Sequence, residues 1–344
     1  MNFSELPKVE LHLHLDCSVS YAVARRFRPG LSRSAYEEAF IAPPKCKDLA
    51  DFLKRAVRGF ELLQSEAALR QATLDLLGQL EAEHVLYAEI RFAPLLHTDG
   101  GLSPEAVVET VLAAIEEGTA AQQLEARLIL CTLRRFSAAQ SLATARLAHR
   151  YFGKGVAGFD IAGDEAAFPL GPHVPAFQWV HSKGIPATAH AGEAMGAESV
   201  LESLSKLHLK RMGHGVRSLE QQAAVDQLLA QGIHLEVCPT SNIQTDVYGT
   251  FRQHPINQLL EAGLPVSINT DGRALCNVSL SEEYQRIFEA FEWPAAQYQA
   301  TLQSAIDAAF APEPLKQRLS REIREKWRYG SSGEAGGSSA SIYS

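Results

Sequence analysis

The feature that most constrains the fold is a regular alternation of short apolar runs with longer amphipathic segments along the chain. The predicted strands are residues 9–15, 85–92, 126–131, 156–161, 186–190, 211–214, 233–237 and 265–268. The predicted helices between them include 66–82, 104–122, 138–151, 175–182, 219–231 and 257–262. Strand–helix alternation is typical of parallel sheets, and eight such units predict an α/β fold of the (β/α)8 TIM-barrel type. A doubly wound sheet is the alternative, but no Gly-x-Gly-x-x-Gly motif follows an early strand.

The domain organisation expected from this pattern is a single barrel domain over residues 1–329, since barrels reach this length as one unit. The first connection, about 18–84, is long for a barrel crossover and has helical spacing of apolar residues at 49–57. This helix either packs on the barrel or forms a lid over the active site. A helical region follows the last strand, and the Gly/Ser-rich tail 330–344 is expected to be disordered.

Composition excludes several classes of partner. The net charge of −8 argues against nucleic acid, whose phosphates need basic patches, and favours a small neutral or cationic molecule. No apolar run approaches the roughly 18 residues of a membrane span, and the N-terminus has no signal-peptide pattern. The five scattered cysteines include no Cys-x-x-Cys pair, which favours reduced thiols and a cytoplasmic protein. Oligomeric state is left open.

The first predicted strand carries two histidines and an aspartate at alternate positions. His12, His14 and Asp16 share one face, because side chains alternate along a strand. Burying three such groups beside leucines is costly unless something satisfies them, and a metal ion would. The segment by itself fits a polar-faced edge strand and a metal site equally well.

Polar side chains also follow the later strands, where barrel enzymes carry their chemistry. Of the twelve histidines, His12, His14, His190 and His214 stand at strand ends, and Asp271 follows the last strand. The others are interpreted as surface or structural: His84, His97, His149, His173, His181, His208, His234 and His254. Imidazole and carboxylate ligands without thiolate are typical of zinc or a similar transition metal.

Two further groups near these ligands indicate a hydrolase. The carboxyl of Glu193 could transfer a proton if its pKa is raised, and His214 could orient a water molecule or accept its proton. A bound metal lowers the pKa of water to about 7. The set predicts attack by an activated water on an electrophilic carbon.

A series of motifs resembles the adenosine deaminase family of the amidohydrolase superfamily, from about residue 7 to 285 and in family order. Each motif is weak alone, but together they are highly specific. They are 7–16 (PKVELHLHLD), 87–94 (YAEIRFAP), 130–134 (LCTLR), 160–165 (DIAGDE), 190–193 (HAGE), 213–215 (GHG), 236–242 (EVCPTSN) and 267–271 (SINTD). The signature of the cysteine-ligated zinc deaminases is absent.

The resemblance implies one zinc ion per subunit, with ligands His12, His14, His190 and Asp271. Glu193 would supply a proton at purine N1, while His214 and Asp271 would orient the water that attacks C6. Loss of ammonia would leave inosine.

The resemblance also implies the substrate contacts. They are the Gly163 N–H to purine N3, Asp16 to the ribose 5′-hydroxyl, His14 beside the substrate, and an apolar gate of Leu49, Phe52 and Leu53. The sequence departs from the family pattern at two positions. Cys17 stands where glycine is common, and Gly272 stands where a second aspartate would contact purine N7. A buried acceptor left without a partner costs about 1–3 kcal/mol, so substrate affinity or range is expected to differ.

The predicted function is hydrolytic deamination of adenosine and 2′-deoxyadenosine in purine salvage. Asp16 favours a free 5′-hydroxyl, since adenine-deaminase-like relatives tend to carry Glu there and N6-methyl-AMP deaminase-like relatives Asn. Aminodeoxyfutalosine, adenine and N6-substituted AMP remain alternative substrates because Cys17 and Gly272 are unusual. AMP itself is disfavoured by the lack of an evident basic phosphate site. A non-catalytic nucleoside-binding protein and a metal-dependent phosphoesterase or amidase are disfavoured by the intact proton donor and the single-metal ligand set.

Overall fold

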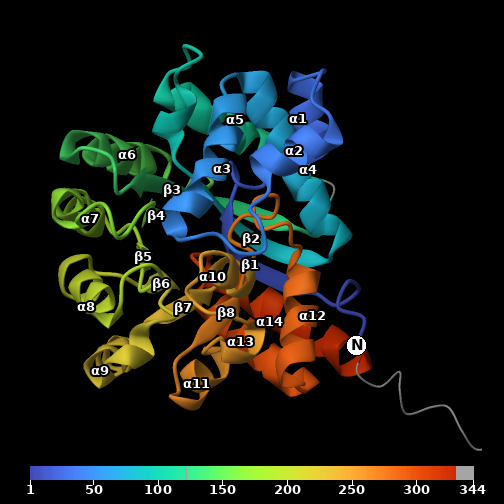
Figure 1. Ribbon diagram of the computed structural model, residues 1–344, viewed down its shortest axis with the longest axis vertical. Helices are drawn as coiled ribbons and strands as arrows, with labels where there is room; N and C mark the ends of the chain where they lie inside the picture. Colours follow the sequence, from blue (N-terminus) through green and yellow to red (C-terminus); the bar gives the residue numbers. More distant parts are fainter. Residues whose placement is uncertain (121, 331–344) are drawn as a thin grey trace, which may run out of the picture.

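The computed structural model describes residues 1–120 and 122–330, with side chains described as far as Trp327. Its centre is a ring of eight strands in two parallel four-stranded sheets (Figure 1). Single bridges, Leu13 with Asp271 and Phe159 with Ala187, connect the sheets on both sides. The strands are β1 (Lys8–His14), β2 (Val85–Phe92), β3 (Glu125–Leu133), β4 (Val156–Ala162), β5 (His190–Ala191), β6 (Arg211–His214), β7 (His234–Val237) and β8 (Val266–Ile268). The predicted barrel is confirmed.

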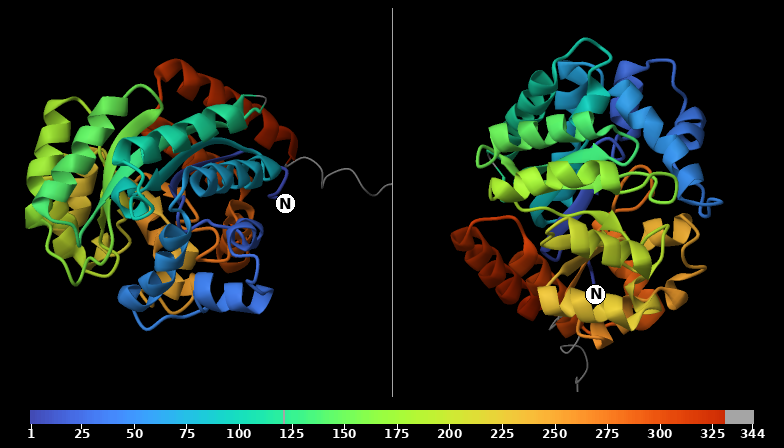
Figure 2. Two further views of the ribbon diagram at one scale, coloured as in Figure 1. Left: turned by 90° about the horizontal axis from the view of Figure 1, so that it is seen from above. Right: turned by 90° about the vertical axis from the view of Figure 1, so that its left-hand side faces the viewer.

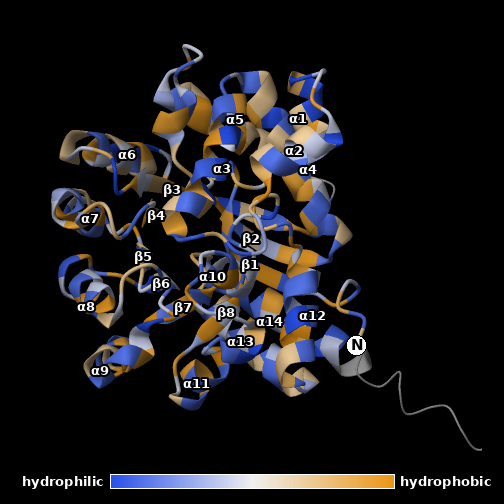
Figure 3. Ribbon diagram, in the orientation of Figure 1, coloured by the Kyte–Doolittle hydropathy of each residue, from blue (hydrophilic) through white to orange (hydrophobic). Residues whose placement is uncertain are grey.

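Amphipathic helices surround the strands, and Figure 3 shows both hydrophobic and hydrophilic colours on each of them. Those connecting successive strands are α4 (Glu66–Ala82), α5 (Pro104–Thr119), α6 (Ala138–Tyr151), α7 (Val174–Ser182), α8 (Ala197–Lys206), α9 (Gln222–Gln231), α10 (Pro239–Gln244) and α11 (Ile256–Glu261). Short 3-10 turns are η1 (Pro94–His97), η2 (Gly171–His173), η3 (Ser218–Glu220) and η4 (Phe251–Gln253). Many of the helices have a side-chain N-cap. At α6 the Ser137 side chain accepts from the Gln140 N–H and the Gln140 side chain accepts from the Ser137 N–H, which is a capping box.

The long first connection folds into three helices before α4, namely α1 (Tyr21–Phe27), α2 (Arg33–Phe40) and α3 (Leu49–Leu62). Figure 2 shows these blue helices at one end of the barrel and the red C-terminal helix at the other. The predicted helix at 49–57 is confirmed, and it begins after Asp48, whose side chain accepts a hydrogen bond from the Asp51 N–H.

The chain after β8 is helical as predicted, with α12 (Leu280–Phe291), α13 (Ala295–Ala308) and α14 (Glu313–Gly330). Within the described residues, none of the helices has both the length and the hydropathy of a membrane span. The tail predicted to be disordered lies outside the described residues from 331 onward.

The fifth strand differs from its prediction. Residues 186–190 were expected to form it, but regular pairing is confined to His190–Ala191. The preceding segment is still extended: the Phe159 N–H donates to the Pro186 carbonyl, and the Thr188 N–H donates to the Phe159 carbonyl. Proline has no N–H to donate, so the ladder is interrupted where the two sheets meet.

Candidate active site

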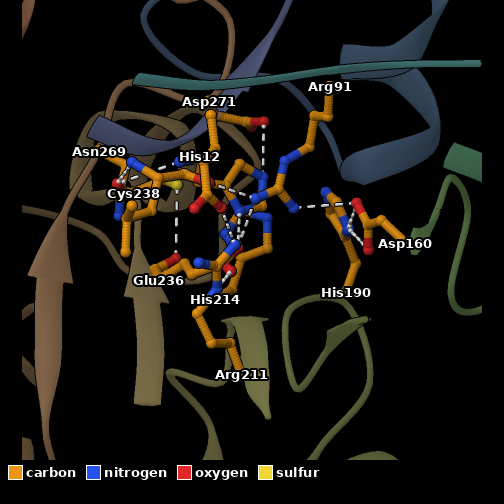
Figure 4. Close-up of polar contacts among 12 residues, drawn as sticks. His12, Arg91, Asp160, His190, Arg211, His214, Glu236, Cys238, Asn269 and Asp271 are labelled. Atoms are coloured by element: carbon orange, nitrogen blue, oxygen red, sulfur yellow. Dashed lines mark hydrogen bonds and ion pairs between the residues drawn. The ribbon is translucent and has the colours of Figure 1, made fainter. Parts of the chain in front are cut away.

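The carboxyl ends of the strands bring together five side chains that the sequence singled out, four of which are labelled in Figure 4. Ligand atoms of His12, His190, His214 and Asp271 all lie within 4.8 Å of one another. His14 is at the same centre, because its Nε2 lies 3.1 Å from Nε2 of His190 and 3.5 Å from Oδ1 of Asp271. The structure therefore holds one more candidate ligand than a four-ligand site needs.

The backbone at two of these residues is in the left-handed region, with φ of 59° at His214 and 63° at Asp271. Such conformations are unfavourable for residues other than glycine and persist where the surroundings enforce them. At Asp271 the left-handed conformation is enforced by two hydrogen bonds with β1. The Asp271 N–H donates to the His12 carbonyl at 3.0 Å, and the Asp271 carbonyl accepts from the His14 N–H at 2.7 Å. Closure of the barrel thus fixes a candidate ligand.

The outer ring nitrogens of two histidines are held by buried carboxylates. Nδ1 of His12 is 2.9 Å from Glu236, and Nδ1 of His190 is 3.3 Å from Asp160. Both rings therefore present Nε2 to the centre, which is the arrangement of histidines that bind metals. Nε2 of His12 is buried and makes no hydrogen bond with the residues that the structure describes, and it lies 3.3 Å from Oδ1 of Asp271, where a metal ion could bind both groups. These residues fit a divalent metal.

Glu236 lies beneath the site in a buried ion-pair network. It accepts hydrogen bonds from Arg91 at 2.7 Å and from Arg211 at 2.6 Å, and Arg211 also pairs with Glu89. Burial alone would raise the pKa of Glu236, but the two guanidinium groups hold it well below its ordinary value. Glu236 stays anionic and can hold His12. Sequence reasoning included this residue in a motif but gave it no role.

Glu193 and His214 face each other across the centre, with His214 Nε2 3.6 Å from Glu193 Oε2. Burial, together with the negative charge of Asp271, raises the pKa of Glu193 well above its ordinary value, which favours the protonated form of this carboxyl. The loop that carries Glu193 is held by Glu165, which accepts from the N–H groups of Gly192, Glu193 and Met195. Glu165 is a second residue whose role the sequence did not reveal.

The tautomer of His214 follows from its neighbours. Burial lowers its pKa well below the ordinary value, so the ring is neutral. The Asn242 amide donates to its Nδ1 at 3.2 Å, and the Asn242 carbonyl oxygen in turn accepts from His254 at 3.2 Å. With Nδ1 as the acceptor, Nε2 of His214 carries the proton and points into the site.

A cavity of about 340 Å³ opens above these groups and is lined mainly by apolar side chains. The predicted substrate contacts that line it are His14, Asp16, Gly163, Leu49, Phe52 and Leu53. Gly272 is not among its lining residues, whereas Cys17 is. His97, which the sequence analysis left as structural, lies with Nε2 3.7 Å from Asp16 Oδ2. Burial would raise the pKa of Asp16, but His97 outweighs it and the carboxyl remains ionised.

Comparisons with known proteins place this geometry in a family. The family model described as adenosine deaminase matches residues 7–326. An adenosine deaminase of Clostridium acetobutylicum is 31% identical over 334 residues, covering 94% of this chain and 100% of the relative.

Two solved structures share the fold. An adenine deaminase from Arthrobacter aurescens superposes with a TM-score of 0.84 at 26% identity, over 93% of this chain and 98% of its own. A zinc-bound amidohydrolase from Burkholderia ambifaria gives 0.86 at 23% identity, over 95% and 92%. With its motifs, its barrel and its histidine–aspartate centre in agreement with these matches, the chain belongs to the adenosine deaminase family.

Proposed function

We propose that this protein deaminates adenosine and 2′-deoxyadenosine hydrolytically, releasing ammonia and forming the corresponding inosine. The observation that carries the proposal is the position of Glu193, whose pKa burial raises well above its ordinary value, on the same centre as four histidines and Asp271. A proton donor and a water-activating centre on the same pocket are what addition of water to a ring C–N bond requires. The family's curated relative, named adenosine deaminase, supports the same substrate.

The metal would be one zinc ion, held by His12, His14, His190 and Asp271. All three histidines can present an unprotonated Nε2, and burial lowers the pKa of His14 to about 3, which keeps it neutral. His214 is the group left outside the ligand set, because its Nε2 carries a proton. Bound zinc would supply the Lewis acidity that makes water a nucleophile near neutral pH. Zinc is also the metal named for the Burkholderia ambifaria protein of the same fold.

The chain's own residues then act in order. Glu193 donates its proton to purine N1, which draws electron density from C6. The Nε2–H of His214 donates a hydrogen bond to the attacking water, and Asp271 accepts one from it. Water adds to C6 as one of its protons passes to Asp271, and this proton then moves to the exocyclic amino group. The bond from C6 to the exocyclic nitrogen breaks, ammonia leaves, and the remaining hydroxyl proton returns to Glu193 as the C6 carbonyl forms.

The nucleoside substrate would bind at the mouth of the cavity. Asp16 is ionised and can accept a hydrogen bond from the ribose 5′-hydroxyl, while the Gly163 N–H would donate to purine N3. Helix α3 would act as a lid, since Leu49, Phe52 and Leu53 line the cavity from outside the barrel. Exclusion of water by these apolar side chains would strengthen the hydrogen bonds within. The five unpaired cysteines support a cytoplasmic location.

A panel assay tests the proposal. Ammonia release by the zinc-loaded enzyme would be compared across adenosine, 2′-deoxyadenosine, adenine, AMP, N6-methyl-AMP and aminodeoxyfutalosine, with Glu193→Gln as the matched inactive control. The nucleosides with a free 5′-hydroxyl should give the highest kcat/KM. A higher value for another 6-aminopurine would reassign the substrate, and no release from any of them would refute deamination.

A further inference from the structure

The two positions at which this sequence departs from the family pattern are in contact. Gly272 follows Asp271 after β8, and Cys17 follows Asp16 after β1. An ideal Cβ atom on Gly272 would lie 2.6 Å from Cβ of Cys17, 3.2 Å from the Cys17 carbonyl oxygen and 3.3 Å from Cβ of Leu275. Carbon atoms do not approach to 2.6 Å without displacement of one of them. Any side chain at 272 therefore conflicts with the Cys17 side chain.

Glycine is required at 272 for space and not for conformation. Gly272 is not among the glycines of this chain with positive φ, so its backbone is accessible to other residues. The conflict cannot be relieved by moving the loop, because the Cys17 carbonyl accepts from the N–H groups of Ala274 at 3.1 Å and Leu275 at 2.9 Å. These two hydrogen bonds hold the end of β1 against the loop after β8.

The Cys17 side chain takes the place that a side chain at 272 would occupy. Cys17 lines the cavity together with Asp16, Asp271 and Leu275, whereas Gly272 does not. It packs on the apolar cluster that includes Leu49 and Phe52 of α3. The loop after β1 therefore builds this wall of the cavity, and the wall carries the Cys17 thiol. A polar side chain from the loop after β8 could otherwise have occupied this place.

We infer that Cys17 and Gly272 act as one specificity-determining pair, in which Cys17 excludes polar recognition of the substrate from position 272. The inference deepens the proposed function and rests on it for the identity of the substrate. The part of the substrate that the pair would affect is the one that the resemblance to the adenosine deaminase family implies for this position, namely purine N7.

A double-mutant cycle tests the pair through stability, a readout independent of activity. Gly272→Ala should lower the thermal midpoint by about 3 °C or more, as overpacking does. The same substitution in the Cys17→Gly background should lower it far less, because the conflicting atom is gone. Gly30→Ala is the control, since nothing lies within 4 Å of its Cβ position and its φ is not positive. An equal loss in both backgrounds, or none in either, would overturn the pairing.

A second arm tests specificity with adenosine and 7-deazaadenosine, in which a C–H replaces N7. The Cys17→Gly/Gly272→Asn variant gains an amide donor at this wall. Its preference for adenosine over the 7-deaza analogue, as a ratio of kcat/KM, should be about tenfold or more above that of Cys17→Gly/Gly272→Ala. An unchanged ratio would overturn the assignment of this wall to N7. If the unmodified enzyme released no ammonia from any 6-aminopurine, the proposed function would fail while the stability cycle still decided the pairing.

Discussion

Gly59 of α3 lies directly on the backbone carbonyl of Asp16, so close that a Cβ atom on Gly59 would overlap the carbonyl oxygen. This contact joins the helix over the cavity to the residue proposed to bind the ribose. Glycine is unfavourable within a helix by roughly 0.5–1 kcal/mol relative to alanine, so its presence at this point has a packing reason.

Replacing this glycine should separate the two elements. We expect Gly59→Ala to raise KM for adenosine at least tenfold and to lower the thermal midpoint, because the added methyl group must displace α3 from Asp16. Steady-state kinetics and thermal unfolding measure the two effects. Gly78→Ala in α4 is the matched control: it is an exposed helical glycine with nothing within 4 Å of its Cβ position and should be neutral or slightly stabilising. Similar behaviour of both variants would remove the role of the Gly59 contact.

The proposed role of Glu193 as proton donor makes a kinetic prediction. Glu193→Gln keeps the shape of the side chain but cannot supply the proton, and general acid–base steps contribute about 10²–10⁴-fold. We expect kcat to fall at least a hundredfold while zinc content, measured by elemental analysis, stays unchanged. Glu202→Gln, at a half-buried position on α8 where the carboxylate pairs with Lys206, should retain full activity. Near-normal turnover by Glu193→Gln would assign the proton to another group.

Removal of metal should abolish activity and lower stability together. A ligand that binds only the folded state stabilises it by about 2.7 kcal/mol at a hundred times its dissociation constant. Dialysis against a chelator should therefore lower the thermal midpoint as activity disappears, and added zinc should restore both. Full activity in protein shown to be free of metal would exclude the zinc mechanism.

The buried carboxyl of Glu283 in α12, which lies outside the active site, should make the stability of the protein depend on pH. The Glu283 side chain is buried and its Oε1 accepts from the Thr240 N–H, while its Oε2 has no hydrogen-bond partner in the part of the chain that the structure describes. Burial raises its pKa to about 8. Between roughly pH 5 and 8 the folded state therefore binds more protons at this residue than the unfolded chain, and its contribution to the free energy of unfolding falls as pH rises.

Glu283→Gln removes this titration. The variant should gain stability relative to the unmodified protein as pH increases from 5 to 8, by about 1–3 kcal/mol at the upper end, measured by urea unfolding. Glu289→Gln, at an exposed position on the same helix, should show no such trend. A constant difference between Glu283→Gln and the unmodified protein across this range would mean that Glu283 is ionised in the fold.

Local patterns were sufficient to predict the strand ends of this protein. The alternation of His12, His14 and Asp16 on one strand, and the polar residues after the later apolar runs, identify the groups that the barrel brings together. The order of a (β/α)8 chain then places all strand ends on one face, so a one-dimensional pattern becomes a three-dimensional cluster. The helices α4 and α6 were also predicted with their observed bounds, because apolar periodicity and serine caps agree there.

Contacts between segments that are distant in the sequence could not be predicted from local patterns. Nothing near Glu236 in the sequence shows that Arg91 and Arg211 neutralise it, because these residues meet only across the barrel interior. The same holds for the contact of Gly59 with Asp16 and of Cys17 with Gly272. The fifth strand has too few paired residues for an alternating pattern to be distinguished from a loop.

The backbone hydrogen bonds that join His12 and His14 to Asp271 have a consequence for the order of synthesis, folding and metal binding. His12 and His14 leave the ribosome long before Asp271, which follows β8. If these residues hold the proposed zinc ion, a nascent chain cannot complete the site until β8 has inserted beside β1. Zinc uptake would then report that the barrel has closed, and a truncated product that lacked β8 and Asp271 would have an incomplete set of ligands.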